Sequence, residues 1–340
     1  MDAGAKKILD RVKARKFDPV YVLQGEETFY IDLISNYIET HVLSETDKGF
    51  NQVVLYGKDV SVATILTHAK RFPMMAERQV VIVKEAQEIQ DLQKETGSKL
   101  LLDYLAHPLH STILVLCHKH KTLDKRRELG KKIDQLAVSA TFKKPYENQL
   151  ATFVTDYLKG RGKGIEDEAV RILTEYVGND LNRLANEMEK VLIAVPANGP
   201  VSAEHVMSQV GISKEYNIFE LQKALIRRDL FQVSKIVNYF EANTRKNPMI
   251  PMIAFLYSFF SKLLVACSTS DRSEKGLVTA LKISPFAAKD YSTALNNYSI
   301  DKVLEGITLL KQADLKLKGV DSGSSDEGQI LKEVIFRLMM

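Results

Sequence analysis

The sequence predicts an α/β domain built on a parallel sheet, followed by two regions that are entirely helical. Up to about residue 140, short runs of Val, Ile and Leu alternate with helical patterns, which is typical of a parallel sheet covered on both faces. After Lys143-Lys144-Pro145 the apolar residues recur at three- and four-residue steps, which indicates helices. Glycine and proline are scarce, 17 and 9 among 340 residues, and this favours helices over an all-β fold.

The first region reads as an alternation of helices and strands. Pro19 is expected to begin the first strand, and apolar residues at helical spacing follow Gly25. A lysine- and arginine-rich stretch, 123–133, is expected to be helical. In order, we expect a helix at 8–12, a strand at 20–23, a helix at 29–41, a strand at 50–56, a helix at 62–69, a strand at 80–83, a helix at 100–105, a strand at 112–117, a helix at 123–133 and a strand at 137–142.

The second part of the chain reads as helices separated by clear breaks. Gly178 is expected to cap one helix, and the proline-containing stretch 196–200 to end the next. Further breaks are expected at Asn247-Pro248, at 268–273 and at 321–328. Helices are expected at 150–159, 166–177 and 181–195, with a short one from Ser202 to Gly211 and others from about 215 onward. These breaks give three expected domains, at residues 1–143, 144–212 and 213–340.

Composition indicates a soluble, intracellular protein. The net charge of +4 is too small to predict free-standing nucleic-acid binding. Cys117 and Cys267 lie far apart, so we expect no disulfide framework and a reducing cytoplasm. Residues 1–16 are charged and contain no apolar run, so we expect no signal peptide. The apolar stretch 249–267 is interrupted by Pro251 and Lys262, and we expect a core helix rather than a membrane span.

The turn after the first strand lacks the groups that bind nucleotide phosphates. The strand at 20–23 leads to Gly25 and then to Glu26 and Glu27. A P-loop needs a glycine-rich turn ending in Gly-Lys-Ser or Gly-Lys-Thr, and neither sequence occurs in this chain. Two carboxylates would repel a triphosphate, whereas the dipole of a helix stabilises acids in its first turn. The layout therefore predicts a nucleotide-binding architecture that cannot use a nucleotide.

Several stretches, in their order and spacing, resemble a known family. They are Pro19–Glu27, Phe72–Glu85, Val177–Leu181 followed by Asn186–Lys190, and Tyr216–Glu220. Together they resemble the clamp-loader branch of the AAA+ ATPases, and within it the delta subunits of bacterial DNA polymerase III. The resemblance covers the whole chain. It implies an AAA+-like α/β domain, a small three-helix lid, and a helical collar that holds subunits together in a ring.

The resemblance also marks positions where the chemistry of an ATPase is missing. An AAA+ ATPase ends its Walker B strand with Asp-Glu, which serves Mg²⁺ and the attacking water, whereas this chain has Lys84-Glu85. The arginine that the lid of such ATPases presents to the γ-phosphate corresponds to Leu181. We therefore expect no ATP hydrolysis, no cofactor and no metal, and a degenerate nucleotide site made of Gly25, Glu26, Glu27, Lys84, Glu85 and Leu181. No second cluster of ligands at zinc spacing accompanies the sequence Cys117-His118-Lys119-His120, so we expect no zinc site there.

An apolar run in a predicted loop, Phe72-Pro73-Met74-Met75, is the candidate for function. Such a run must either pack inward or serve a partner. The resemblance implies a clamp-binding site in which Met74 and Met75 enter a hydrophobic pocket on a ring-shaped sliding clamp, with Phe72 and Pro73 shaping the turn. Methionine suits an adaptable interface because it is unbranched and polarisable. We expect Phe72 itself to pack inward; in the alternative interpretation, both methionines also close the core.

The basic stretch that begins the predicted helix at 123–133 is a candidate DNA contact. In the family, AAA+ domains wind around primed DNA, and Lys121, Lys125, Arg126 and Arg127 are the candidate phosphate contacts. The alternative is a solvated charged face. No aromatic residue interleaves with the run, so stacking on single-stranded DNA gets no support.

The function that the resemblance implies is that of a polymerase accessory subunit without a catalytic site. Such a subunit binds and opens the sliding clamp (beta) for loading onto primed DNA during replication. Its implied partners are the clamp-loader ATPase subunits (gamma/tau) and delta-prime, in a cytoplasmic hetero-pentamer. Two alternatives from other classes remain: an unusual nucleotide-dependent AAA+ ATPase, and a scaffold or adaptor unconnected with replication.

Overall fold

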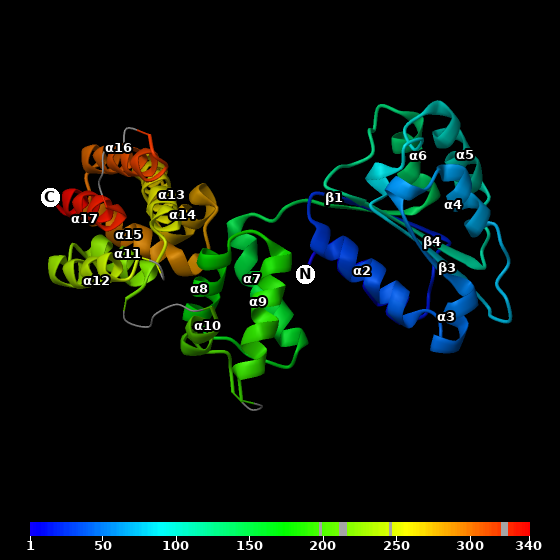
Figure 1. Cartoon of the computed structure of the whole chain (residues 1–340), viewed down its shortest axis with the longest axis horizontal. Coiled ribbons are helices and arrows are strands. Elements are labelled where there is room, and N and C mark those ends of the chain that lie inside the picture. Colours follow the sequence, from blue (N-terminus) through cyan, green and yellow to red (C-terminus); the bar gives the residue numbers. More distant parts are fainter. Residues whose placement is uncertain (197–198, 211–215, 245–246, 321–325) are drawn as a thin grey trace. The chain divides into compact units, whose positions relative to one another are not determined.

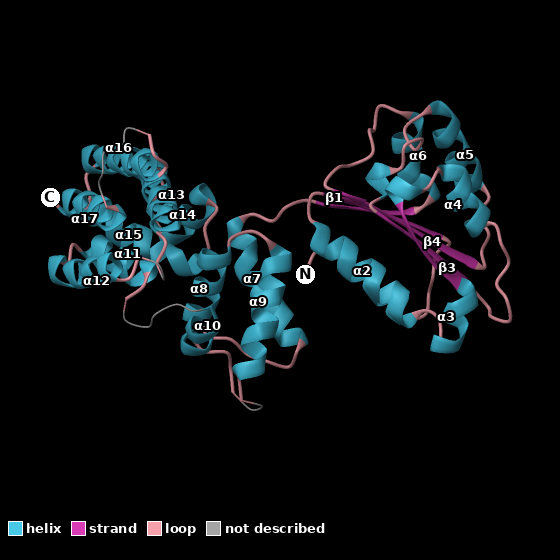
Figure 2. Ribbon diagram, in the orientation of Figure 1, coloured by secondary structure: helices cyan, strands magenta, loops and turns pink. Residues whose placement is uncertain are grey.

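The chain forms two compact units, Met1–Pro145 and Tyr146–Met340 (Figure 1). The computed structural model describes residues 1–196, 199–210, 216–244, 247–320 and 326–340. The first unit contains five strands with helices on both faces. The described part of the second unit is helical, apart from a short bridge between Ile165 and Val201 (Figure 2).

The sheet of the first unit is entirely parallel, with the strand order β2-β3-β4-β1-β5. Since all strands run the same way, every amino end meets at one edge and every carboxyl end at the other. Val20 lies opposite Leu114 in β4, and Gly25 lies opposite Phe142 in β5. The strands are β1 (Val20–Gly25), β2 (Gln52–Tyr56), β3 (Gln79–Lys84), β4 (Thr112–Lys119) and β5 (Val138–Phe142).

Helices cover both faces of this sheet, as the continuous apolar strands predicted. Val20 and Val22 of β1 belong to a core cluster with α4, α5 and α6. The alternate residues Tyr21 and Leu23 are also buried, and α2 packs on the sheet. The helices of this unit are α1 (Ala3–Lys13), α2 (Thr28–His41), α3 (Glu45–Asn51), α4 (Val62–Ala69), α5 (Glu95–Ala106) and α6 (Glu128–Leu136).

Two predicted elements of the first unit are wrong at their ends. The strand expected from residue 50 begins at Gln52, because Ser44 caps a helix, α3, that continues to Asn51. The basic helix expected from residue 123 begins only at Glu128. The carboxylate of Asp124 accepts a hydrogen bond from the backbone N–H of Arg126 at 2.9 Å, a local turn that competes with the helix. Lys121, Lys125 and Arg126 therefore lie in a loop.

The second unit begins with the helices expected for a lid and continues with a helical bundle. Gly178, with a φ of +78°, caps α8 as predicted. The expected boundary between residues 212 and 213 lies outside the described residues, so the division of this unit into lid and collar stays a prediction. Its helices are α7 (Glu147–Gly160), α8 (Asp167–Val177), α9 (Leu181–Ala194), α10 (Ala203–Val210), α11 (Ile218–Arg227), α12 (Leu230–Ala242), α13 (Met249–Ser268), α14 (Glu274–Leu281), α15 (Ala288–Asn297), α16 (Ile300–Leu317) and α17 (Glu327–Met339).

The long helix α13 lies in the core of this bundle. Among the described helices it is the one that could cross a bilayer by length and composition. Its residues Leu256, Phe260 and Leu263 are buried in a cluster that includes residues of α16 and α17. Pro251 does not break the helix because it stands in the first turn, where no intrahelical acceptor is waiting for its missing N–H.

Candidate functional site

The apolar loop, residues 72–75, lies at the amino edge of the sheet and is tied to the end of α3. Asn51, the last residue of α3, comes directly before β2, and Gln52 of β2 pairs with Val80 of β3. The side chain of Asn51 makes two hydrogen bonds with the backbone of Met74. Its Oδ1 accepts from the Met74 N–H at 2.6 Å, and its Nδ2 donates to the Met74 carbonyl at 2.9 Å. Asn51 is buried, so a rigid part of the domain fixes the backbone of Met74.

The side chains of this loop point to solvent. Met75 is fully exposed, Phe72 is 76% exposed and Met74 is 53% exposed. Met75 also has a φ of +55°, a left-handed conformation that is uncommon for a non-glycine residue and persists where the surroundings fix it. The structure therefore contradicts the alternative in which the two methionines close the core of the first unit.

The prediction that Phe72 packs inward is wrong, and the polar group beneath the loop explains why. Gln79, at the start of β3, is buried and donates from Nε2 to the carbonyl of His68 at 3.2 Å and to the hydroxyl of Thr112 at 2.8 Å. It also bonds the carbonyl of Arg71. This polar cluster satisfies the backbone carbonyls at the end of α4, so a polar group and not an apolar pocket lies buried where the loop leaves the helix.

Phe50 is an exposed aromatic residue that the sequence analysis missed. It is 71% exposed and directly precedes Asn51, the residue bound to Met74. Its apolar neighbours in sequence indicated a strand, and a strand pattern concealed its exposure. Clusters of exposed large apolar side chains often mark interaction surfaces. Phe50 therefore joins Phe72, Met74 and Met75 as a candidate contact.

At the opposite, carboxyl edge, the turn after β1 leaves no room for a phosphate-binding loop. β1 ends at Gly25 and α2 begins at Thr28. Gly25 has a φ of +132°, and a Cβ there would lie 2.0 Å from the carbonyl oxygen of Phe142. Glu27 is buried, and its Oε1 accepts from the Phe29 N–H at 2.9 Å. The chain's own carboxylate thus caps the helix end that in a P-loop would receive phosphate, while Glu26 stays exposed.

The lysines at the carboxyl edge are held by carboxylates. Lys84, at the position expected for a Walker B acid, lies 3.0 Å from Glu39. Lys119 lies 2.8 Å from Asp32 and 3.4 Å from Glu85. These pairs neutralise the lysines within the domain. They leave no carboxylate pair placed as an ATPase would need for Mg²⁺ and water.

Leu181 lies in the second unit and serves packing. It is the first residue of α9 and is buried in the described part of that unit. The nearby Arg183 is exposed, and its N–H donates to the helix-capping carboxylate of Asp180 at 3.0 Å. A buried leucine cannot supply the positive charge that the corresponding lid arginine supplies in an ATPase.

Three of the four candidate DNA contacts have partners within the chain. Lys125 lies 3.0 Å from Asp134, and Arg126 lies 2.9 Å from Asp124. Arg127, at the cap of α6, donates to the carbonyl of Gln93. Lys121 is exposed, and its carbonyl accepts from the ring of His118 at 2.9 Å.

Cys117 and His118 at the end of β4 are buried structural residues. Burial raises the pKa of the Cys117 thiol to about 12, so the thiol stays protonated at neutral pH. Burial also lowers the pKa of His118. Within the described ranges, no group of three or more His, Cys, Asp or Glu side chains is placed to hold a metal ion.

Comparison with known proteins shows which family the chain resembles. Residues 21–143 match the family model described as DNA polymerase III, delta subunit. Over 334 residues the chain is 24% identical to the DNA polymerase III subunit delta of Bacillus subtilis (strain 168), covering 96% of this chain and 95% of that protein. The chain is similar to the DNA polymerase III delta subunits.

The relationship to the delta subunits extends to the fold of the whole chain. The solved structure of the Bacillus subtilis DNA clamp loader delta protein matches with a TM-score of 0.59 and 23% identity. The match covers 98% of this chain and 99% of that one. The predicted fold class, an α/β region with a parallel sheet followed by helical regions, is therefore confirmed, as is the resemblance to delta subunits inferred from the sequence motifs.

Proposed function

We propose that this chain is the clamp-loader subunit that binds the sliding clamp (beta) and opens it for loading onto primed DNA, without hydrolysing ATP itself. The observation that carries the proposal is the apolar loop: Met74 and Met75 are exposed on a backbone that Asn51 fixes. A soluble domain gains nothing by exposing such side chains unless a partner covers them. The similarity to delta subunits supports this choice of partner.

The loop has the properties of an interface anchor. Burying two methionines in a partner's pocket would contribute about 3–6 kcal/mol before the costs of association. Because Asn51 already holds the backbone of Met74, little further ordering is required when the loop binds. Phe50 and Phe72 would enlarge the contact around the two methionines.

Clamp opening follows from differential binding. A surface that fits the open or distorted ring better than the closed ring shifts the equilibrium toward opening, by at most the difference between the two binding free energies. No nucleotide is consumed by this subunit in such a mechanism. The glutamate cap at Glu27 and the ion pair between Lys84 and Glu39 support a role without ATP, as an accessory subunit of the polymerase holoenzyme with no catalytic site.

Other subunits would supply the ATP-driven switch. We propose the ATPases (gamma/tau) and delta-prime as neighbours in a cytoplasmic hetero-pentamer, held together by the collar at residues 213–340. Ile250, Tyr257 and Val265 of α13 support this, because they are exposed at a spacing that places them along one side of the helix. Such an uncharged stripe is suited to burial between subunits.

Contact with DNA would occur in the assembled complex. Lys121 and Arg127 have no ion-pair partner among the described residues. Lys125 and Arg126 would have to exchange a carboxylate partner for a phosphate. The net charge of +4 agrees with a contribution that is weak outside the assembly.

A pull-down with the full chain tests the proposal. The tagged chain, incubated with purified sliding clamp and clamp-loader ATPases, is expected to retain both. Retention of neither would favour a scaffold unconnected with replication. ATP binding and turnover by the chain alone would favour the unusual ATPase. The proposal fails if the ATPases are retained but the clamp is not.

A further inference from the structure

A cavity of about 260 Å³ lies among helices of the second unit. Residues of α7, α8, α11, α13 and α15 line it. Its volume far exceeds the 10–15 Å³ or so that one water molecule needs, and it falls just below the range of about 300–1,000 Å³ typical of drug-sized ligands. It therefore suits a small group rather than a nucleotide.

Two buried oxygen atoms on the wall of this cavity lack hydrogen-bond donors. Glu175 Oε2 and Gln222 Oε1 have no hydrogen-bond partner among the described residues. Gln222 is only 5% exposed. A buried acceptor without a partner costs about 1–3 kcal/mol, and such groups are rare in folded proteins. Two of them on one cavity wall indicate that something with N–H or O–H donors belongs there.

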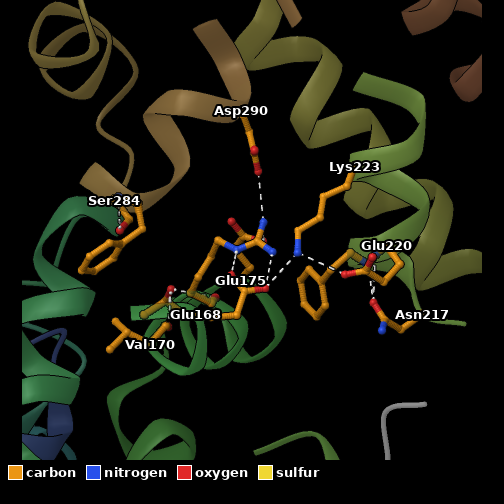
Figure 3. A network of polar contacts seen from close by, with 12 residues as sticks. Glu168, Val170, Glu175, Asn217, Glu220, Lys223, Ser284 and Asp290 are labelled. Carbon is orange, nitrogen blue, oxygen red and sulfur yellow. Dashed lines mark hydrogen bonds and ion pairs between the residues drawn. The ribbon is translucent and has the colours of Figure 1, made fainter. Parts of the chain in front are cut away.

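The neighbouring charges favour a cation. Arg171 is almost fully buried and binds Glu168 at 2.8 Å and Asp290 at 3.0 Å, but it lies 4.0 Å from Glu175. Figure 3 shows the side chains of Glu168, Glu175 and Asp290 in this network. The other bases are also engaged: Lys223 lies 3.0 Å from Glu168 and 3.1 Å from Glu220, Lys262 pairs with Glu147, and Arg227 acts electrostatically on the Asp290 carboxyl. Five carboxylates (Glu147, Glu168, Glu175, Glu220 and Asp290) thus face four bases (Arg171, Lys223, Arg227 and Lys262).

We propose that this cavity binds the nitrogen end of an organic cation, a primary ammonium or a guanidinium group. Such a group carries the positive charge that the site lacks and several N–H donors for Glu175 and Gln222. Phe255, Phe259 and Tyr291 also line the cavity and suit an apolar stem or a cation over a ring. A metal ion fits less well, because no group of three metal-binding side chains occurs in the described part.

The test is a titration of the full chain with methylammonium at constant ionic strength, followed by NMR. We expect saturable binding in the millimolar range and a fall in the pKa of the Glu175 carboxyl, because a bound cation favours its charged form. Burial holds that pKa at about 7, with Asp290 and Glu168 adding to the rise and Arg171 and Lys262 opposing it. Affinity should therefore increase as the pH rises through 7.

Control variants and a control cation test whether binding depends on the cavity residues and on N–H donors. Glu175→Gln and Gln222→Leu should each weaken binding at least tenfold while melting cooperatively, whereas Glu274→Gln, an exposed acid at the start of α14, should have no effect. Tetramethylammonium has charge but no N–H donor and should bind at least tenfold more weakly. The proposal is overturned if methylammonium does not bind, if it binds no better than tetramethylammonium, or if neither cavity variant weakens it.

A second arm separates the two sources of such a group. It relies on the function proposed above, because it repeats the titration with the clamp-loader ATPases bound. If they abolish methylammonium binding, the natural occupant is a lysine or arginine side chain of a neighbouring subunit. If binding persists, the occupant is a free amine. Failure of the ATPases to bind the chain at all would count against the proposed function and leave the first titration valid.

Discussion

Asn51 and Met74 are joined by two hydrogen bonds, in which one side chain both donates to and accepts from the backbone of a residue 23 positions later. The pair links the end of α3, next to an edge strand, to the loop before β3. Consequently Met74 owes its position to the sheet and not to the loop alone. A rigid element, the end of α3, therefore fixes the backbone geometry of the loop.

Replacing both methionines, Met74→Ser with Met75→Ser, is expected to weaken clamp binding at least tenfold, which corresponds to about 1.4 kcal/mol. The melting temperature should stay within about 1 °C, because both side chains are exposed and contribute little to the core. Surface plasmon resonance and thermal denaturation check the two expectations. Ile193→Ser, an exposed apolar residue of α9, is the matched control and should leave clamp binding unchanged. A double variant with normal clamp affinity would remove the loop from the interface.

Removing the side-chain amide, Asn51→Ala, should affect stability and binding together. The backbone of Met74 would lose a donor and an acceptor partner, and we expect a loss of about 1–3 kcal/mol in the free energy of unfolding. Clamp affinity should also fall, because the loop must then be ordered on binding. Urea denaturation and clamp binding measure the two effects. Unchanged affinity in a clearly destabilised variant would show that the loop needs no preorganisation.

The chain alone should not bind MgATP at millimolar concentration. Glu27→Ala removes the carboxylate that caps α2 and should reduce stability by about 0.5–2 kcal/mol without creating a phosphate site, because Gly25 remains pressed against the backbone of Phe142. Calorimetric titration measures this, with a clamp-loader ATPase as positive control. The degenerate site would be contradicted if the unmodified chain bound ATP and the Glu27→Ala variant bound it with a different affinity.

Arg171→Met is expected to destabilise the second unit by about 3–5 kcal/mol. The substitution leaves Glu168 and Asp290 without their shared buried cation. Arg126→Met provides the contrast, because Arg126 pairs with Asp124 on the surface and its loss should change stability far less. Urea unfolding of the two variants gives the comparison. Equal losses would mean that the Arg171 network carries no special stability.

Glu175 should make the chain less stable as the pH rises. Its pKa is raised to about 7 in the folded state, so between its usual value of 4.5 and 7 the folded state binds more protons than the unfolded state. Stability should therefore fall across this window, and Glu175→Gln should remove that part of the fall, leaving the variant more stable than the parent by up to about 3 kcal/mol at pH 8.

Glu168→Gln should behave in the opposite sense. Burial opposes ionisation of Glu168, but hydrogen bonds from Arg171 and Lys223 outweigh it and lower the pKa. The ionised Glu168 stabilises the folded state above the usual pKa of the group, and this stabilisation is lost in acid. The variant should therefore be less stable than the parent at pH 8 and similar to it at low pH. Unfolding at pH 3, pH 5 and pH 8 measures both variants, and matching pH profiles would reject the assignment.

The sheet could be predicted because it depends on local patterns. Runs such as 80–83 are apolar on both faces, and this pattern has few interpretations other than a buried parallel strand. The expectation about nucleotide also has a local basis, because neither Gly-Lys-Ser nor Gly-Lys-Thr occurs at Gly25. The sequence alone therefore supported the fold class and the expectation about nucleotide.

Features that depend on distant residues could not be predicted. Phe72 is exposed, and the buried group near the end of α4 is the polar pair Gln79 and Thr112, which come from two different strands. The loop at 120–127 replaces the predicted helix start because one carboxylate, that of Asp124, captures a backbone N–H. The bond between Asn51 and Met74 and the orphaned Gln222 likewise arise only from tertiary packing.

A parallel sheet keeps the beginnings and the ends of its strands apart. In this chain the apolar loop lies where strands start, and the turn after β1 lies where they finish. Selection can consequently remodel one without disturbing the other. An engineer could alter residues 72–75, or attach a reporter beside the turn after β1, and expect the two changes to add independently.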